Sequence, residues 1–161
     1  MAQEIERKFL LKDDRWRAQV SRTATMRQGY LASDASCSIR VRVTGDVGYL
    51  NIKSATLGVA RSEFEYAIPV TEARELLDLF CRGRCLDKVR HYISRPPHIW
   101  EIDVFEGDNA GLVVAEIELT SEAESFACPE WLGPEVSADP RYYNVCLVDH
   151  PYSAWSAASR D

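Results

Sequence analysis

The chain has 161 residues with a formal net charge of −6 and 27% charged residues, a size that suits one domain with its own core. This composition excludes disordered and collagen-like classes, and no run approaches the ~20 apolar residues of a membrane span. The first residues carry charges where a signal peptide has its apolar core, and the acidic balance opposes nucleic-acid binding. We therefore expect a cytoplasmic protein that binds neither a membrane nor nucleic acid.

Alternation of apolar and polar residues is the dominant pattern and predicts strands. In chain order the strands are predicted at about 3–11, 24–31, 37–44, 48–54, 61–69, 86–94, 99–106 and 113–120. The run Gly45-Asp46-Val47-Gly48 predicts a hairpin turn between the third and fourth strands. Many strands at short spacing predict an α+β fold, in which a closed antiparallel eight-stranded β-barrel carries its helices outside.

Helices are predicted in the gaps between strands from cap signals. These signals are Asp13 or Asp14 before Trp16, Thr71 before a helix through Arg82, the capping-box spacing Ser121–Glu124, and Asp139-Pro140 before a helix through Leu147. No linker divides the chain, so residues 1–148 are predicted to form one domain. Residues 149–161 are predicted to be a flexible tail, with docking of Tyr152 and Trp155 on the domain as the alternative.

One face of nearly every predicted strand is charged. In the first strand, Glu4, Glu6 and Lys8 share a face, and Ile5 and Phe9 lie on the other. The basic positions of this kind are Lys8, Arg40, Arg42, Lys53, Lys88 and Arg90. The acidic positions are Glu4, Glu6, Glu63, Glu65, Asp103, Glu116 and Glu118.

A sheet with one solvated face also alternates in this way. Two details favour a charged lumen instead. The positions are mostly Glu, Asp, Lys or Arg rather than Ser, Thr or Gln, and the signs are grouped by strand. Inside a barrel each group would face the opposite charge. The cations suit a polyanion, and the carboxylates suit hard divalent metal ions, which together serve metal-assisted phosphoryl transfer.

These residues resemble a known family. The run Glu4-x-Glu6-x-Lys8 is similar to the signature of the CYTH, or triphosphate tunnel metalloenzyme, superfamily. The remaining pairs follow in the family's order from Arg40-Val-Arg42 to Glu116-Ile-Glu118, and the resemblance covers about residues 3 to 148. Local strings such as Arg27-Gln-Gly-Tyr-Leu31 resemble the short bacterial branch, which includes inorganic tripolyphosphatases.

The resemblance implies roles for these positions. The six basic residues would hold a triphosphate, and the seven carboxylates would be candidate ligands of Mg²⁺ or Mn²⁺. Glu4 and Glu6 would be catalytic through the metal, which activates water for attack on a terminal phosphorus. Tyr30 resembles a branch tyrosine that accepts a proton, tuned by the catalytic Lys88. A free tyrosine has a pKa near ~10 and is a poor base, so a lumen-lining or phosphate-binding Tyr30 is an equal alternative.

Three functions follow as hypotheses. The first is hydrolysis of inorganic tripolyphosphate. The second is an adenylate cyclase or a nucleoside or thiamine triphosphatase, for example one acting on ATP. The third is a non-catalytic module that binds polyphosphate or nucleotides. The outer apolar strand faces exceed what short helices cover, which predicts a homodimer.

Overall fold

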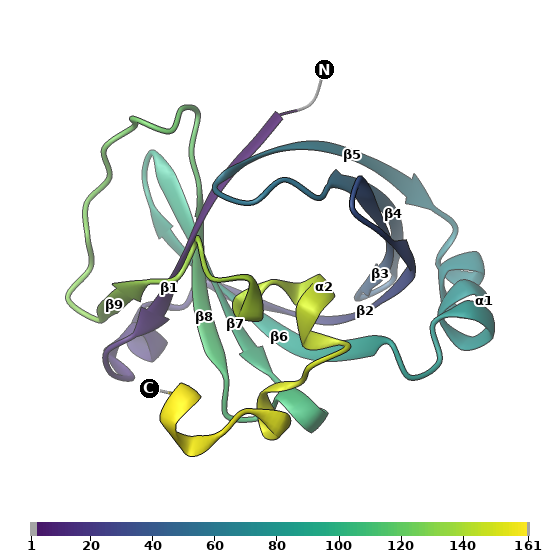
Figure 1. Cartoon of the computed structure of the whole chain (residues 1–161). Coiled ribbons are helices and arrows are strands. Elements are labelled where there is room, and N and C mark those ends of the chain that lie inside the picture. Colours follow the sequence, from purple (N-terminus) through teal and green to yellow (C-terminus); the bar gives the residue numbers. More distant parts are fainter. Residues whose placement is uncertain (1–2, 161) are drawn as a thin grey trace.

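The computed structural model describes residues 3–160, so positions 1, 2 and 161, the outer limits of the predicted domain and tail, lie outside the described residues. All strands join one antiparallel sheet (Figure 1). They are β1 (Gln3–Leu11), β2 (Arg22–Ser33), β3 (Cys37–Thr44), β4 (Val47–Ser54), β5 (Ala60–Ile68), β6 (Cys85–Arg95), β7 (His98–Phe105), β8 (Val113–Glu118) and β9 (Leu132–Glu135). The helices are α1 (Val70–Phe80) and α2 (Asn144–Leu147), with short 3-10 turns at Arg15–Gln19, Gly107–Asn109, Pro140–Tyr142, Tyr152–Ala154 and Ala157–Ser159.

The first strand closes the barrel. The strand order is β5-β4-β3-β2-β6-β7-β8-β1, and the N-terminal part of β1 returns to β5, with Glu4 opposite Arg61. The predicted closed eight-stranded barrel is therefore confirmed. The sheet also has a ninth strand, β9, which pairs with the C-terminal part of β1. The sequence did not predict β9, because Gly133 and Pro134 are residues that weaken strand propensity.

The apolar faces of the strands point outward and are covered in three places. One cluster, which includes Phe9, Trp100 and Trp131, lies beneath Trp16 and the segment before β9. A second includes Leu147 and Trp155 from the C-terminal segment. The third lies beneath α1. The interior of the barrel is therefore left to polar side chains, the reverse of most small barrels.

Helix α1 packs close to the sheet because glycine lies beneath it. A Cβ at Gly29 would lie 2.6 Å from the Cβ of Cys81, and one at Gly48 would lie 2.7 Å from the Cβ of Ala73. Leu77 and Val41 meet in the same cluster. Figure 1 shows α1 on the outer side of the curved sheet. None of the helices among the described residues has the length and apolar character that crossing a membrane requires.

Several cap predictions were wrong. The N-cap residue of α1 is Pro69 rather than Thr71, and no side chain makes a cap hydrogen bond there. The helix ends at Phe80 rather than Arg82. No helix forms at 121–124, because the Glu124 carboxylate accepts hydrogen bonds from the backbone N–H and the hydroxyl of Thr120. The Asp14 side chain makes no cap hydrogen bond to the turn at Arg15–Gln19, although Asp13 accepts one from the Arg15 N–H.

The helix predicted from Asp139 is interrupted. The Asp139 carboxylate accepts from the Arg141 N–H, as expected of a cap. Tyr143 is then extended, at φ −74° and ψ 134°, and separates the 3-10 turn from α2. After the break, Tyr143 and the first two residues of α2, Asn144 and Val145, line the cavity inside the barrel.

The described part of the C-terminal tail lies on the domain. Trp155 is buried, and its ring meets those of Tyr142 and Tyr152 edge to face with centroids 5.1 Å apart. The Tyr152 N–H donates to the side-chain oxygen of Asn109 at 2.9 Å. The structure thus shows the alternative in which Tyr152 and Trp155 dock on the domain. The domain boundary at residue 148 and the flexibility of residues 149–161 stay predictions.

Candidate active site

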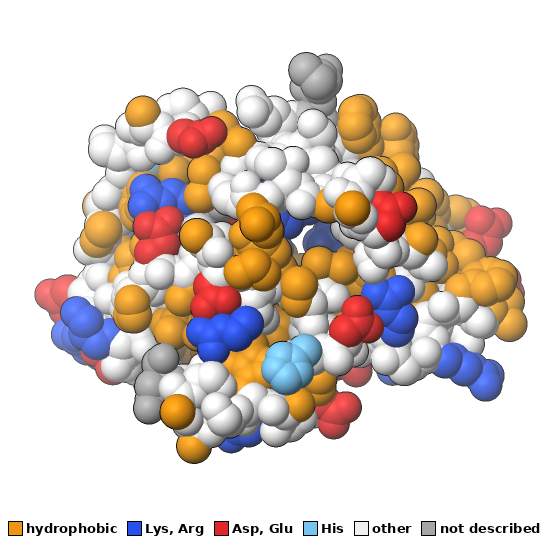
Figure 2. All heavy atoms as spheres, viewed as in Figure 1, with side chains coloured by type: hydrophobic (Ala, Val, Ile, Leu, Met, Phe, Trp, Pro, Cys, Tyr) orange, Lys and Arg blue, Asp and Glu red, His pale blue; other side chains and the backbone are white. Residues whose placement is uncertain are grey.

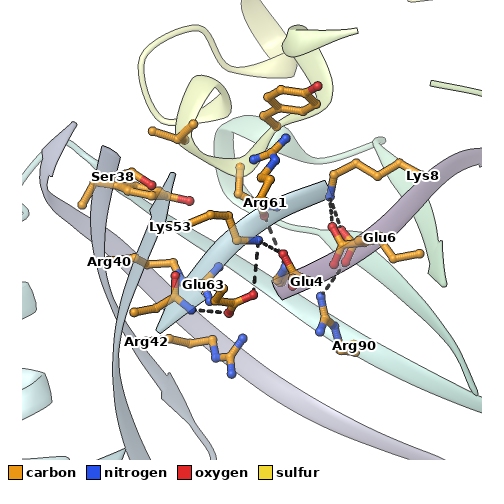
Figure 3. A pocket seen from close by; sticks show the side chains of 17 residues that line it. Glu4, Glu6, Lys8, Ser38, Arg40, Arg42, Lys53, Arg61, Glu63 and Arg90 are labelled. Carbon is orange, nitrogen blue, oxygen red and sulfur yellow. Dashed lines mark hydrogen bonds and ion pairs between the residues drawn. The ribbon is translucent and has the colours of Figure 1, made fainter. Parts of the chain in front are cut away.

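The charged strand faces line a tunnel, of which Figure 3 shows the inner part. We call this part the central chamber; it is lined by Glu4, Glu6, Lys8, Tyr30, Ser38, Arg40, Arg42, Asn51, Lys53, Arg61, Glu63, Lys88, Arg90, Glu116, Tyr143, Asn144 and Val145. On one side it joins a wider cavity, the acidic mouth, lined by Gln3, Glu4, Glu6, Arg42, Glu63, Glu65, Arg90, Pro97, His98, Ile99, Glu101, Glu116, Glu118, Leu119 and Thr120. Six residues belong to both, so the two cavities are continuous.

Most residues predicted for the site line the tunnel. Glu65 and Glu118 lie at the acidic mouth rather than in the central chamber. Asp103 lines neither cavity and is fully buried. The roles of these residues stay predictions.

The arginines of β3 keep donors unused. Arg40 and Arg42 approach the Glu65 carboxylate only at 3.7 and 3.5 Å. The buried Nε of each finds no hydrogen-bond acceptor among the described residues. Burial, with Arg40 and Arg90 nearby, lowers the pKa of Arg42. Two largely buried guanidinium groups with free donors form a site for an anion rich in oxygen.

A buried ion network lies beside them. Lys8 Nζ lies 2.6 Å from Glu116 and 3.0 Å from Glu6. Burial opposes the charge of Lys8, but these two carboxylates outweigh burial and raise its pKa. Burial likewise opposes the charge of Glu116, but Lys8 and Arg90 hold its pKa well below the usual range. Both groups are therefore charged at neutral pH.

Asp103 supports the two cations of β6. One oxygen accepts from Lys88 Nζ at 2.6 Å, and Arg90 binds both oxygens, with Nε at 2.8 Å and one terminal nitrogen at 2.9 Å. Burial opposes ionisation of Asp103, but Arg90 and Lys88 hold its pKa below its ordinary value. Burial, aided by Arg90, lowers the pKa of Lys88 to about 8. With both oxygens taken, Asp103 is placed to orient Lys88 and Arg90.

The carboxylates gather toward the acidic mouth. Burial and the neighbouring Glu63 raise the pKa of Glu4, although Lys53 lies 2.6 Å away. Burial, with Glu4 and Glu6, also raises the pKa of Glu118. Burial, with Glu116 among nearby carboxylates, raises that of Glu101 to about 7. Crowded carboxylates with raised pKa values lack positive charge, which a divalent cation would supply.

The tunnel offers oxygen donors that suit a metal ion, but these donors are not arranged as a ready-made metal site. Within residues 3–160, no three His, Cys, Asp or Glu side chains converge as a metal-binding group. Lys53 and Lys8 instead hold Glu4 and Glu6, as Figure 3 shows. The oxygen donors match hard divalent cations. A metal would therefore compete with these lysines, and the lysines would be released toward an anionic substrate.

Several tunnel residues were missed by the sequence reasoning. Asn51 is almost fully buried and donates to Glu63 and, at 3.3 Å, to Glu65. It was not predicted because its side chain is neutral, although it lies two residues from Lys53 and therefore on the same face of β4. Glu101 is not among the predicted lumen residues, yet it lines the acidic mouth and forms an ion pair with Arg90. Asn144 comes from α2 and accepts from Lys88 at 3.2 Å, a contact that no local pattern indicates.

Tyr30 lies in the central chamber and is 4% exposed. Its hydroxyl lies 3.5 Å from the Gln28 amide nitrogen, which is a weak contact. Lys88 is held instead by Asp103 and Asn144. The hydroxyl is thus available to a ligand, and tuning by Lys88 stays a prediction.

The fold and the site together define a class: barrels whose tunnel carries facing groups of cations and carboxylates. The model of the CYTH domain matches residues 2–144, so the chain belongs to the CYTH domain family. It is similar to an inorganic triphosphatase of Acetivibrio thermocellus, at 44% identity over 94% of this chain and 97% of the relative. Another inorganic triphosphatase, from Nitrosomonas europaea, is 37% identical over 90% of this chain and 96% of its own.

Solved structures give the same picture. The crystal structure of the inorganic triphosphatase NE1496 has a TM-score of 0.65 and 34% identity, and covers 92% of this chain and 95% of its own. A putative adenylyl cyclase, HpAC1 from Hippeastrum, described with a dominant triphosphatase activity, has a TM-score of 0.53 at 15% identity over 75% of this chain. At that identity the likeness shows the fold alone.

Proposed function

We propose that this chain is an inorganic triphosphatase, a hydrolase that cleaves tripolyphosphate with the help of a divalent metal ion. The observation that carries the proposal is the pair of largely buried guanidinium groups, Arg40 and Arg42, whose Nε donors are unused and which share the tunnel with crowded carboxylates. Both full-length relatives named above are inorganic triphosphatases. A cytoplasmic location belongs to the same proposal.

The metal ion, Mg²⁺ or Mn²⁺, would be held by Glu4 and Glu6, with Glu63, Glu65, Glu116 and Glu118 as further candidates. A bound ion of this kind neutralises phosphate charge and lowers the pKa of a water molecule. Asp103 is the weakest candidate, because Lys88 and Arg90 occupy both of its oxygens. We assign it the orientation of these two cations instead.

The basic residues bind and orient the substrate. Arg40, Arg42 and Arg90 offer planar donors to phosphate oxygens, and Lys8, Lys53 and Lys88 offer point charges. In hydrolysis the oxygen of water bonds to the terminal phosphorus, and the bridging oxygen leaves with pyrophosphate. The cations stabilise the charge that spreads over the phosphoryl oxygens as that bond breaks.

The proton of the attacking water needs an acceptor. Tyr30 is one candidate, and a tunnel carboxylate that does not hold the metal ion is another. A Tyr30→Phe variant separates them. Unchanged turnover would leave Tyr30 as a wall of the chamber, whereas a large fall in kcat at unchanged KM would support proton transfer.

The direct test is phosphate release from tripolyphosphate with Mg²⁺ and Mn²⁺ in turn. Glu4→Gln should lower kcat/KM by about 100-fold or more, because even indirect partners of a metal typically contribute 10–100-fold. Glu72→Gln, an exposed carboxylate on α1, is the matched control and should behave as wild type. Turnover without any divalent metal, or full activity of Glu4→Gln, would overturn the proposal.

The alternatives use the same tunnel. An adenylate cyclase would release pyrophosphate and a cyclic product from ATP, and a non-catalytic module would bind tripolyphosphate without turnover. The same assay decides between them when ATP and thiamine triphosphate are included. Hydrolysis of tripolyphosphate at a higher kcat/KM than the organic compounds is the expected result.

A further inference from the structure

One neutral side chain, that of Asn51, lies deep among the charges of the tunnel. Asn51 is 2% exposed, lines the central chamber, and shares the inner face of β4 with Lys53. In the sheet it lies between Arg40 of β3 and Glu65 of β5, each directly opposite it in register. A lysine at this position would face Glu65, and a carboxylate would face Arg40. The neutral amide forms neither ion pair.

The Asn51 amide links two carboxylates of β5. Its nitrogen Nδ2 donates to Glu63 and, at 3.3 Å, to Glu65. An amide nitrogen carries two hydrogens, so one group serves both acceptors. The reversed amide would turn its carbonyl oxygen toward two carboxylate oxygens, which are acceptors as well, so the hydrogen-bond network selects one orientation. Asn51 therefore holds the two carboxylates together.

Cations approach these two carboxylates only at longer range. Lys53 Nζ lies 3.8 Å from Glu63, and terminal nitrogens of Arg40 and Arg42 lie 3.7 and 3.5 Å from Glu65. In three other pairs inside the barrel, a lysine Nζ lies 2.6 Å from a carboxylate oxygen. Coulomb attraction falls with distance, and a neutral donor adds no charge. Glu63 and Glu65 are thus fixed in place while much of their negative charge stays unneutralised.

Asn51 lies where the cation-rich and carboxylate-rich parts of the tunnel meet. It lines the central chamber but not the acidic mouth, whereas Glu63 lines both and Glu65 lines the mouth alone. Figure 2 shows Lys and Arg side chains at the bottom of a hollow on the face that carries α2. A triphosphate needs such cations, and a divalent ion needs oxygen ligands that keep their charge. A charged residue at position 51 would favour one of these ligands and weaken the other.

We propose that Asn51 is a positioning residue of the metal site, which holds Glu63 and Glu65 side by side as ligands for the divalent ion without neutralising them. The inference rests on the proposed function, which names these two carboxylates as candidate ligands. In this role Asn51 acts through the carboxylates and not on the reacting atoms. Its neutrality keeps the metal site acidic and leaves the cations of the central chamber to the substrate.

Two variants of the same shape test the hydrogen bonds. Asn51→Thr keeps one hydroxyl donor, whereas Asn51→Val removes every side-chain donor, and both residues suit a strand. The electron paramagnetic resonance signal of free Mn²⁺ measures metal affinity, and calorimetry measures tripolyphosphate affinity of the metal-free protein. Asn51→Val should weaken Mn²⁺ binding by about 10–100-fold, the range for groups that orient ligands, and Asn51→Thr should weaken it less. Tripolyphosphate affinity should stay within about twofold in both, because no charge changes.

A third variant tests the neutrality of the side chain. Asn51→Lys keeps donors but adds a charge, so Mn²⁺ binding should fall at least as far as in Asn51→Val. Tripolyphosphate binding should instead tighten by about tenfold, the order expected of one added charge nearby. Thr71→Lys adds the same charge at an exposed position of α1 and is the matched control. It should shift each affinity by less than about twofold.

Three results would rule out this role for Asn51. The first is an Asn51→Val variant that binds Mn²⁺ as tightly as Asn51→Thr. The second is an equal loss of Mn²⁺ and tripolyphosphate binding in Asn51→Val, as a damaged barrel would give. The third is an Asn51→Lys variant with unchanged Mn²⁺ affinity. None of these measurements needs turnover, so a wild type that binds both ligands but releases no phosphate would reject the proposed function alone.

Discussion

The Asp103 carboxylate binds two cations of the tunnel without lining it: one oxygen accepts from Lys88, and both accept from Arg90. Alternation places it on the charged face with the metal-binding candidates, but the structure puts it behind that face, buried and bound to Lys88 and Arg90. A two-residue period predicts which face a side chain occupies. It carries no information about depth, which depends on the lengths of the side chains opposite. The long side chains of Lys88 and Arg90 reach the tunnel, whereas the shorter Asp103 side chain stays buried beneath them.

Replacing Asp103 with Asn should therefore destabilise the protein. It leaves two buried cations without their shared counter-charge, and breaking a buried pair typically costs about 3–5 kcal/mol. Chemical denaturation of the metal-free protein measures this. Asp108→Asn, an exposed site nearby, is the control and should lie within about 0.5 kcal/mol of wild type. A variant of normal stability that binds Mn²⁺ weakly would instead assign Asp103 as a metal ligand.

At the scale of elements, strands were predicted well and helix ends poorly. The eight strand bounds match to within about two residues, because most strands have an apolar outer face and a charged inner face. The 121–124 capping box failed because its glutamate binds Thr120 in a loop. Cap motifs specify a local hydrogen bond, and both a helix and a turn can use it.

Helix α1 offers a test of how its packing stabilises the barrel. Leu77 is 4% exposed in the cluster over Val41, whereas Leu79 on the same helix is 68% exposed. Leu77→Ala should reduce the free energy of unfolding by about 2–5 kcal/mol, and Leu79→Ala by less than about 0.5 kcal/mol. Equal effects in thermal or urea unfolding would mean that the helix does not pack as described.

The loop between β8 and β9 should loosen in acid. Hydrogen bonds from Thr120 and contact with His98 lower the pKa of Glu124 to about 2, from an ordinary value of 4.5. Because the folded state favours the ionised form, this contribution to stability is present above about pH 4.5 and is lost as the pH falls toward 2. Glu124→Gln should remove it, so that the stability difference from wild type shrinks across this range. A pH-independent difference would contradict the assignment.

At the scale of the whole molecule, the uncovered apolar surface keeps the homodimer prediction open to test. Phe64 and Tyr66 project from the outer face of β5 and are 42% and 54% exposed. Phe64→Ser with Tyr66→Ser should lower the mass measured by light scattering from that of a dimer to that of a monomer. A monomeric wild type at all concentrations would reject the prediction.

The closure of the ring has a consequence for how the protein is made. The strand that carries Glu4, Glu6 and Lys8 precedes all of its partners, β5, β8 and β9, in the chain. During translation the part of β1 that pairs with β8 stays without this partner until the chain has been made beyond residue 118. Its charged side chains discourage pairing with other nascent chains in that interval. The site therefore forms late, because it requires β1 to pair with a strand more than 100 residues further along the chain. Synthesis of β8 determines when Glu6 and Lys8 can take their places in the tunnel.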